Sequence, residues 1–248
     1  MKNRLDFRNG ETDKSKSAGY MEIKNLGAGN TAELYIYGDI VTETWNDSET
    51  CPKDITDFLN QIDQNADLTV YINSGGGSAF AGIAIYNILK RHTGHKKGIV
   101  DGLAASIASV ILMACDEIVV SAGAMIMIHK PGTYAYGNAD DFAYWIEILN
   151  KVQQNMTEIY MQHAKEGVTA EQITEKLNAE TWMNATDAQE VFDIQIEERP
   201  EVAAYAGEAL KRYKNTPDRI KMSSVETEKN RAAEEENAII AEMELFGI

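Results

Sequence analysis

The feature that most constrains the fold is a short apolar stretch that leads almost directly into three consecutive glycines. Residues Leu68–Ile72 read LTVYI, which is typical of a buried strand, and Gly75, Gly76 and Gly77 follow after two polar residues. The next segment, Ala79–Arg91, carries its apolar residues at helical spacing. A buried strand, a glycine turn and a helix in this order predict a crossover unit on a largely parallel sheet.

The same alternation of strand and helix continues on both sides of this unit. Further strands are predicted at Glu33–Ile40, Lys97–Val100, Glu117–Val120 and Met125–Ile128, and further helices at Lys53–Asn65, Ala104–Met113, Ala139–Lys165 and Thr169–Leu177. Asn138 and Thr169 are expected to cap the last two helices. Sites in such sheets lie in loops after the carboxyl ends of strands, so the loops at 73–78, 101–106 and 129–133 are expected to converge.

Composition divides the 248 residues into three parts. Residues 1–30 are polar and are expected to form a flexible lead-in. Residues 31–198 carry the strand and helix pattern and are long enough to bury a core of their own. Residues 199–248 are charged and end in an alanine- and glutamate-rich stretch with helical spacing, so a partly helical tail is expected there.

Charge and cysteine content exclude several classes of function. The net charge of -16 repels phosphate backbones and anionic lipids, so neither nucleic acid nor a membrane is an expected partner. The two cysteines, Cys51 and Cys115, cannot make a disulfide framework, and no Cys/His cluster predicts a metal site. The polar N-terminus and the lack of an apolar stretch of about 20 residues predict a soluble, intracellular protein.

The glycine turn has a structural interpretation and two functional ones. Glycines let the backbone approach a ligand closely and aim N–H groups at it, as in a phosphate cradle or an oxyanion hole. No Walker lysine follows the turn, and a GxGxxG motif fails because position 80 is Phe. A nucleotide site is therefore disfavoured, and a tight strand-to-helix turn is the simplest alternative.

A serine and a histidine occupy places where catalytic groups are found. Ser106 stands at the start of an apolar helix after Gly102, where the helix dipole and the next N–H favour a nucleophile and an oxyanion. His129 ends the apolar stretch MIMI, a position suited to a general base. Taken singly, Ser106 is better explained as a helix cap and His129 as a structural residue. His92 and His95 lie in a polar turn and are expected to be solvated.

Together, the glycine turn, the serine and the histidine meet the requirements of nucleophilic acyl chemistry. The segments NSGGGSAFAG, GLAASIAS and MIMIHKP resemble, in this order and spacing, the motifs of the Clp protease proteolytic subunit family of self-compartmentalising serine proteases. The phage and prophage head-maturation proteases are the most similar variety. The resemblance runs from about residue 33 to about 195. It implies an α/β fold of the ClpP/crotonase type, a superhelix of ββα units with a long handle helix.

The resemblance implies a role for each catalytic group. Ser106 would be the nucleophile and His129 its general base, which later protonates the leaving amine. The backbone N–H groups of Gly77 and Ile107 would form the oxyanion hole. The family's acid position falls on Glu180, and a glutamate can orient a histidine as an aspartate does, although its longer side chain changes the geometry.

Two other polar residues, Asn178 and Asp187, lie near that position in the sequence. Asn178 is a close alternative to Glu180, because an amide orients the ring in cysteine–histidine–asparagine triads. Asp187 is expected at a helix start instead. The family usually has a proline in the glycine turn where this chain has Gly75, which should make the turn more flexible.

The resemblance also implies how a substrate binds. An extended peptide would add as a strand between the glycine segment, with Gly75, Gly76 and Ser78, and the segment that contains Pro131 and Gly132. Such binding through main-chain hydrogen bonds gives weak sequence preference. No metal and no other cofactor is expected.

The implied function is a serine endopeptidase that cleaves capsid or scaffold protein during phage head maturation in the cytoplasm of a bacterial host, in part at the procapsid. The helix predicted at 139–165 corresponds to the family's handle region, through which subunits of a homo-oligomeric ring pack. Housekeeping degradation with an ATPase partner is the first alternative. A crotonase-fold acyl-CoA enzyme, a membrane-anchored serine–lysine peptidase and a catalytically idle ring subunit are the others.

Overall fold

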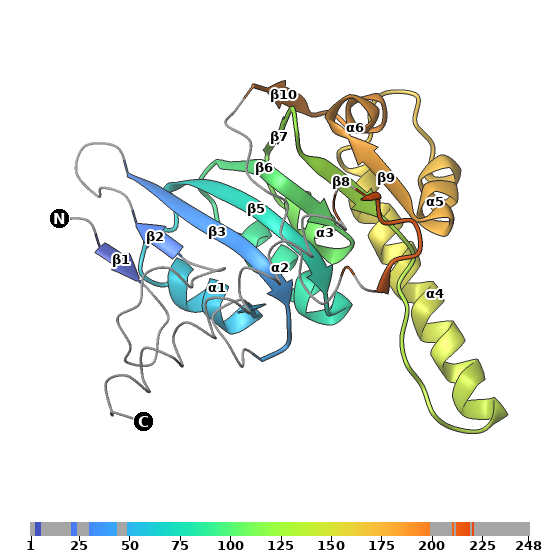
Figure 1. Ribbon diagram of the computed structural model, residues 1–248. Coiled ribbons are helices and arrows are strands. Elements are labelled where there is room, and N and C mark those ends of the chain that lie inside the picture. The colour runs from blue at the N-terminus through green and yellow to red at the C-terminus, as the bar shows by residue number, and fades with distance from the viewer. Residues whose placement is uncertain are drawn as a thin grey trace, which may run out of the picture.

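A twisted, mainly parallel sheet forms the centre of the molecule (Figure 1). The computed structural model describes residues 3–5, 21–23, 30–43, 49–198, 210, 212–218 and 220. The strands are β1 (Asn3–Leu5), β2 (Met21–Ile23), β3 (Thr31–Ile40), β4 (Glu49–Thr50), β5 (Asp67–Gly77), β6 (Lys96–Ala105), β7 (Glu117–Ser121), β8 (Met125–Ile128), β9 (Thr181–Asn184) and β10 (Gln195–Glu197). The helices are α1 (Pro52–Leu59), α2 (Ala79–Arg91), α3 (Ile107–Leu112), α4 (Ala139–Met161), α5 (Ala170–Ala179) and α6 (Ala185–Val191).

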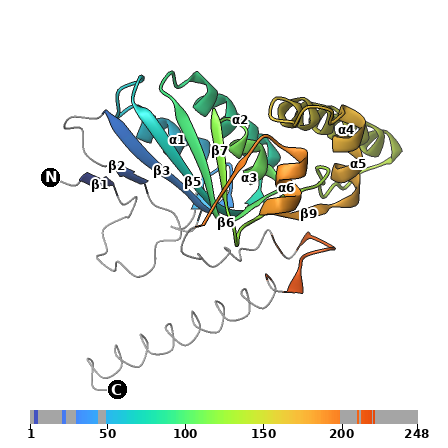
Figure 2. The ribbon, with the colours of Figure 1, turned by 90° about the horizontal axis from the view of Figure 1, so that it is seen from above.

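The order of the strands matches the predicted crossover units. The sheet runs β1-β2-β3-β5-β6-β7-β10, and the pairs β3–β5, β5–β6 and β6–β7 are parallel. Helices α1, α2 and α3 cover one face of these strands (Figure 2). The long helix α4 projects away from the sheet (Figure 1). The predicted α/β fold of ββα units with a long handle helix is therefore confirmed.

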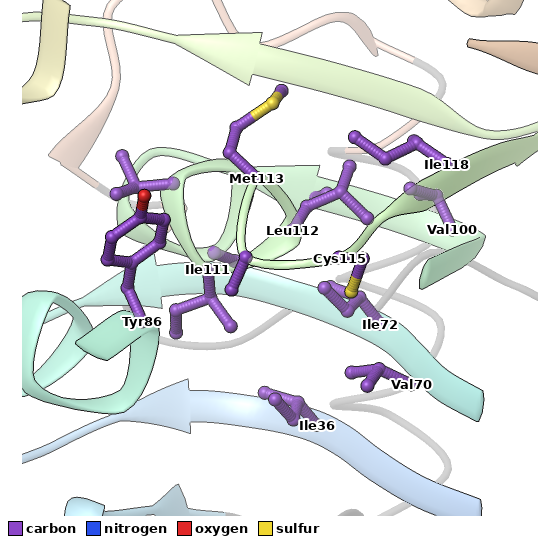
Figure 3. Close-up of a cluster of buried hydrophobic side chains, with 14 of the residues drawn as sticks. Ile36, Val70, Ile72, Tyr86, Val100, Ile111, Leu112, Met113, Cys115 and Ile118 are labelled. Carbon is purple, nitrogen blue, oxygen red and sulfur yellow. The ribbon is translucent and has the colours of Figure 1, made fainter. Parts of the chain in front are cut away.

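The core lies between the sheet and the helices on its face. Ile36, Val70 and Ile72 point from β3 and β5 toward Ile111 and Leu112 in and at the end of α3 (Figure 3), and all five side chains are almost completely buried. Burying one such side chain stabilises a fold by about 1.5–3 kcal/mol. The core therefore fixes the strand ends, and with them the loops that follow.

The structure corrects the helix predicted at Ala104–Met113. Strand β6 continues through Ala105, and α3 begins only at Ile107. Residues Leu103–Ala105 pair in parallel with Met125–Met127 of β8. The alanine-rich sequence favours a helix, but pairing with a neighbouring strand overrides this local preference. Ser106 consequently lies at the junction between a strand and a helix.

The glycine sequence is likewise a strand end and not a free turn. Gly76 and Gly77 pair with Asp39 and Ile40 of β3, and both have positive φ angles, of 93° and 148°. A Cβ atom on Gly77 would lie 2.1 Å from the carbonyl oxygen of Ile40. Only glycine fits this close approach of two backbones.

Other differences concern helix ends and one histidine. Helix α1 ends six residues earlier than predicted, and α4 ends at Met161. His92 is buried and not solvated, because its Nε2 lies 2.6 Å from the carbonyl oxygen of Ala66. The caps predicted at Asn138 and Thr169 are confirmed, since both side chains accept backbone N–H groups of the first helical turn.

The two terminal parts are described only in pieces. Within residues 1–30, predicted as a lead-in, β1 pairs with β2 and β2 pairs with β3, all antiparallel. The helical stretch predicted near the C-terminus lies outside the described residues. The proposed boundaries of the protease-like domain at 31 and 198 therefore stay predictions.

Candidate active site

Ser106 has a strained backbone at the junction of β6 and α3. Its φ and ψ angles are 55° and -124°, a conformation that costs a non-glycine residue about 1–3 kcal/mol. Its backbone N–H donates to the carbonyl oxygen of Met127 at 2.8 Å, which holds the turn against β8. The side chain makes no capping hydrogen bond to α3. The interpretation of Ser106 as a simple helix cap is therefore wrong.

His129 follows β8 and faces the serine. The Oγ atom of Ser106 lies 2.7 Å from Nε2 of His129, within hydrogen-bonding distance. Burial lowers the pKa of His129 from its ordinary value, and the negative charge of Glu180 opposes this shift. The ring is therefore neutral near pH 7, so Nε2 can accept the serine proton.

Of the two predicted oxyanion-hole residues, Ile107 follows the serine directly and Gly77 follows a glycine that lies beside it. Ile107 is the first residue of α3, and the N–H groups of a first helical turn have no partner within the helix. Gly77 follows Gly76, on which a Cβ atom would lie only 2.9 Å from Cβ of Ser106. The N–H of Gly76 itself donates to Ser74 Oγ at 3.1 Å. The glycine-rich end of β5 therefore lies directly beside the nucleophile.

The residues predicted to bind substrate have different surroundings. Ser78 caps α2, with its Oγ accepting the N–H of Ala81, so its side chain has a structural role. The carbonyl oxygen of Gly75 accepts a hydrogen bond from the hydroxyl of Tyr213. Pro131 is half-buried and Gly132 is exposed, in a segment without regular structure. Contact of these residues with a substrate stays a prediction.

Glu180 is close enough to His129 for its charge to act on the ring, but its carboxylate hydrogen-bonds elsewhere. Its backbone is left-handed, with φ of 51°, where α5 ends. Its carboxylate accepts the backbone N–H groups of Lys214 at 3.0 Å and Asn215 at 2.6 Å. In the part of the chain that the structure describes, only Ser106 hydrogen-bonds to the ring of His129. The role of Glu180 as the acid of a triad therefore remains a proposal.

Asn178 and Asp187 make hydrogen bonds to residues other than His129. The amide oxygen of Asn178 accepts a hydrogen bond from Gln153 of α4 at 3.1 Å. Asp187 forms a capping box with Asn184 in the first turn of α6, which confirms its predicted place at a helix start.

Sequence reasoning missed a buried hydrogen-bond network below the nucleophile. Ser109 Oγ donates to the carbonyl oxygen of Ser106 at 2.6 Å and lies 2.8 Å from the hydroxyl oxygen of Tyr160, which can donate to it. All three side chains are buried. Ser109 belongs to the same GLAASIAS segment, one helical turn after Ser106, which is the signal that could have identified it. Nothing in the sequence singles out Tyr160.

Tyr213, in the C-terminal part of the chain, is the second missed residue. Its hydroxyl donates to the carbonyl oxygen of Gly75 at 2.6 Å. Its ring packs edge-on against His129, with 4.9 Å between the ring centroids, and against Trp182. Its position in a charged segment gave no indication of this contact.

Metal ligands and reactive thiols are not features of the described structure. Among the described residues, no group of three or more His, Cys, Asp or Glu side chains could hold a metal ion. Burial raises the pKa of the Cys115 thiol to about 12, so this thiol is inert at neutral pH. No helix within the described ranges is long and apolar enough to cross a membrane.

Comparison with known proteins relates this geometry to one family. The family model described as Clp protease matches residues 34–192. A Bacteroides fragilis ATP-dependent Clp protease proteolytic subunit is 32% identical over 135 residues, which cover 54% of this chain and 64% of that protein. For proteolytic subunit 3 of Rhodococcus jostii the identity is 32% over 152 residues, covering 60% and 74%. For subunit 1 of Streptomyces coelicolor it is 35% over 135 residues, covering 54% and 61%.

The match does not extend over the whole of these relatives. The chain spans 64% of the length of the first Bacteroides protein and 60% of two others. The matched region contains Ser106, His129 and Glu180, whereas Tyr213 lies beyond the family match.

Proposed function

The chain belongs to the Clp protease family, and on this premise we propose that it is a serine endopeptidase. The observation that carries the proposal is the 2.7 Å contact between Ser106 Oγ and His129 Nε2, at a serine whose backbone has a positive φ. A nucleophile held against a neutral histidine is the arrangement that acyl transfer requires.

In the proposed mechanism, Ser106 Oγ attacks the carbonyl carbon of the scissile peptide bond while His129 Nε2 takes the hydroxyl proton. The tetrahedral intermediate then collapses, and His129 gives this proton to the leaving amine. Water, deprotonated by His129, hydrolyses the acyl-enzyme and regenerates the Ser106 hydroxyl. No other co-reactant enters this scheme.

Backbone N–H groups and a carboxylate assist these steps in the proposal. The N–H groups of Gly77 and Ile107 stabilise the negative oxygen of the intermediate, an effect worth about 3–4 kcal/mol for one donor. Glu180 supports the imidazolium form of His129, and its charge already raises the pKa of that ring. An extended substrate lies between the glycine segment and the segment with Pro131 and Gly132.

The proposed assembly is a homo-oligomeric ring that packs through α4. The second half of this helix is anchored by the buried side chains of Val152 and Met156, but its first half exposes Phe142, Tyr144 and Ile146. Apolar side chains on a projecting helix favour burial against another subunit. The relatives named above are ATP-dependent subunits, which supports an ATPase partner as one variant of this proposal.

The finer role that we propose is the cleavage of capsid or scaffold protein in a bacterial cytoplasm, during phage head maturation. It is supported by the resemblance of the three motifs and by the chain that continues beyond the family match to residue 248. Degradation with an ATPase partner is the competing role. Co-purification with an unfoldase ring favours the competing role, whereas processing of co-expressed capsid protein without an ATPase favours the first.

Reaction with a fluorophosphonate probe and hydrolysis of a permanently unfolded protein test the proposed function. The full chain should be labelled at Ser106, and both Ser106→Ala and His129→Ala should lose labelling and hydrolysis. Ser121→Ala, which removes a buried hydroxyl in β7, is the matched control and should retain both. A crotonase-type enzyme would not be labelled at Ser106, and hydrolysis that survives in Ser106→Ala would refute the proposal.

A further inference from the structure

The C-terminal segment from Leu210 to Ile220, here called the Tyr213 segment, lies against the proposed active site. It is drawn in orange-red beside β8 and β9 (Figure 1). Leu210 and Ile220 are buried in a small apolar cluster of their own, with Leu103 and Ala105 of β6 and Met127 of β8. Ala105 directly precedes Ser106, and Met127 lies two residues before His129. The segment is therefore anchored on the strands that carry the two catalytic groups.

Within this segment, the side chain of Tyr213 occupies the space in front of the nucleophile. A Cβ atom on Gly76 would lie 3.1 Å from the Tyr213 hydroxyl and 2.9 Å from Cβ of Ser106. The hydroxyl donates to Gly75, and the Tyr213 ring covers the His129 ring edge-on. The glycine segment is where an extended substrate is proposed to bind. Tyr213 and a substrate would therefore compete for the same place.

The backbone of the segment also engages the proposed acid. Glu180 accepts the N–H groups of Lys214 and Asn215, and the side-chain amide of Asn215 donates to the carbonyl oxygen of Ala179 at 3.1 Å. Hydrogen bonds to a carboxylate are about twice as strong as those between neutral groups. Glu180 is thereby held to the segment, although its charge also acts on the ring of His129.

The charge of the segment suits this binding. Four of the eleven residues from 210 to 220 are lysine or arginine and one is acidic, in a chain with a net charge of -16. The rest of the protein therefore attracts the segment electrostatically.

One buried polar group opposes tight binding of the Tyr213 segment. The hydroxyl of Thr216 is buried and has no hydrogen-bond partner in the described part of the chain. Burying a polar group without a partner opposes docking. Several contacts therefore hold the segment in place, while the buried Thr216 hydroxyl weakens its binding. A segment that is bound and later released is expected to combine such opposing features.

We propose that the Tyr213 segment is an intramolecular inhibitor, which fills the substrate site and must leave before a protein substrate can bind. This inference rests on the proposed protease function. Release exposes Ser106 and the glycine strand, and it frees the Glu180 carboxylate to turn toward His129. The surface around Glu180 and Trp182 is accordingly a peptide-binding site whose occupant is a basic, tyrosine-containing segment of this chain.

The test compares full-length variants by their rate of fluorophosphonate labelling at Ser106. Asn215→Pro removes the N–H donated to Glu180, and Tyr213→Ala removes the side chain in front of Ser106. Both should be labelled faster than the wild type, and Asn215→Pro about tenfold faster, the effect of losing one hydrogen bond to a charged group. Asn215→Ala keeps the N–H and is the matched control, with a much smaller change expected.

A variant with the opposite effect sharpens the test. Thr216→Val replaces the unpaired hydroxyl with a methyl group of the same shape, so it should seat the segment more firmly and slow labelling. A synthetic peptide covering residues 208–222, added to Tyr213→Ala, should also slow labelling, and the same peptide with alanine in place of tyrosine should do so less. Equal labelling rates in all these variants would overturn the proposal.

Hydrogen–deuterium exchange of residues 210–220 separates this inference from the protease proposal. Slow exchange in the wild type and fast exchange in Asn215→Pro are expected. Fast exchange of these residues in the wild type would contradict docking of the Tyr213 segment. Fast exchange in Asn215→Pro without faster labelling of Ser106 would contradict inhibition by the segment. If Ser106 reacts in no variant, even with the segment released, the protease proposal fails, while slow exchange in the wild type still supports the peptide-binding site.

Discussion

Glu180 and His129 directly adjoin the last pair of the β8–β9 ladder, which joins Thr181 to Ile128. The register does not continue past this pair, because Glu180 has a left-handed backbone and the N–H of Lys130 donates to the carbonyl oxygen of Leu177. The charge of Glu180 raises the pKa of His129, although its carboxylate hydrogen-bonds to the backbone of Lys214 and Asn215. The β8–β9 ladder thus brings Glu180 near His129, while the C-terminal segment holds its carboxylate.

The pH dependence of activity should follow His129. Because burial lowers the pKa of His129 below its ordinary value of about 6.5, kcat/KM should rise with pH, and the midpoint of the rise should lie below that value. Glu180→Gln removes the charge that raises this pKa, so the rise should move to lower pH. Peptide hydrolysis measured from pH 4 to 9 in both proteins checks this. A rise centred above pH 7 in the wild type would contradict it.

The free energy of unfolding should depend on pH because two histidines are buried in the folded protein. Burial lowers the pKa of both His129 and His163 in the folded state, so the unfolded chain binds protons first as the pH falls. Their contribution to stability is full above about pH 6.5 and is lost as the pH falls through the folded pKa values. Urea unfolding of His163→Gln should show a weaker loss of stability between pH 6.5 and 5 than the wild type. An unchanged pH dependence would argue against this account.

The network below the nucleophile should couple stability to reactivity. Ser109→Ala leaves the Tyr160 hydroxyl without its partner and releases the carbonyl of Ser106, which should cost about 1–3 kcal/mol. The rate of labelling at Ser106 should fall as well, because the strained turn loses a support. Tyr160→Phe and the double variant complete a thermodynamic cycle, with a coupling energy above about 0.5 kcal/mol expected. Strictly additive effects would show that the two hydroxyls act separately.

Adding a methyl group to Gly76 should damage the site. Gly76→Ala forces a Cβ atom to within 2.7 Å of the carbonyl oxygen of Ala105, at a φ of 93° that alanine tolerates poorly. The melting temperature and the labelling at Ser106 should both decrease. Gly132→Ala is the control for stability, since its Cβ atom would meet no atom within 4 Å. Equal melting temperatures for the two variants would contradict the proposed close packing.

The exposed half of α4 should govern assembly. Ile146 is 60% exposed, so Ile146→Asp should leave the monomer fold intact and should prevent its burial between subunits. Sedimentation velocity is expected to show a smaller species than the wild type. Asn150→Asp, an exposed change on the same helix, is the control and should assemble normally. An unchanged mass for Ile146→Asp would exclude this face as the contact.

Local sequence pattern predicted most of the fold, and it failed where a distant strand decided the conformation. The spacing of apolar residues located the central strands and α2, and Asn138 and Thr169 marked two helix starts. The helix predicted at Ala104–Met113 is wrong in its first residues, because alanine-rich sequence favours a helix whereas pairing with β8 makes these residues a strand. The place of Ser106 at a helix start identifies it from sequence, but its positive φ and its hydrogen bond to Met127 of β8 depend on the tertiary fold.

The sequence by itself determined the α/β class, the three motifs and the identities of the serine and the histidine, because these depend on residue type and near-neighbour spacing. The tertiary structure alone decided which groups touch. It set Ser106 against His129, put Ser109 and Tyr160 beneath them, and brought Tyr213 from far along the chain to Gly75. Contacts between residues so distant in sequence arise from burial and strand pairing, which no local pattern encodes.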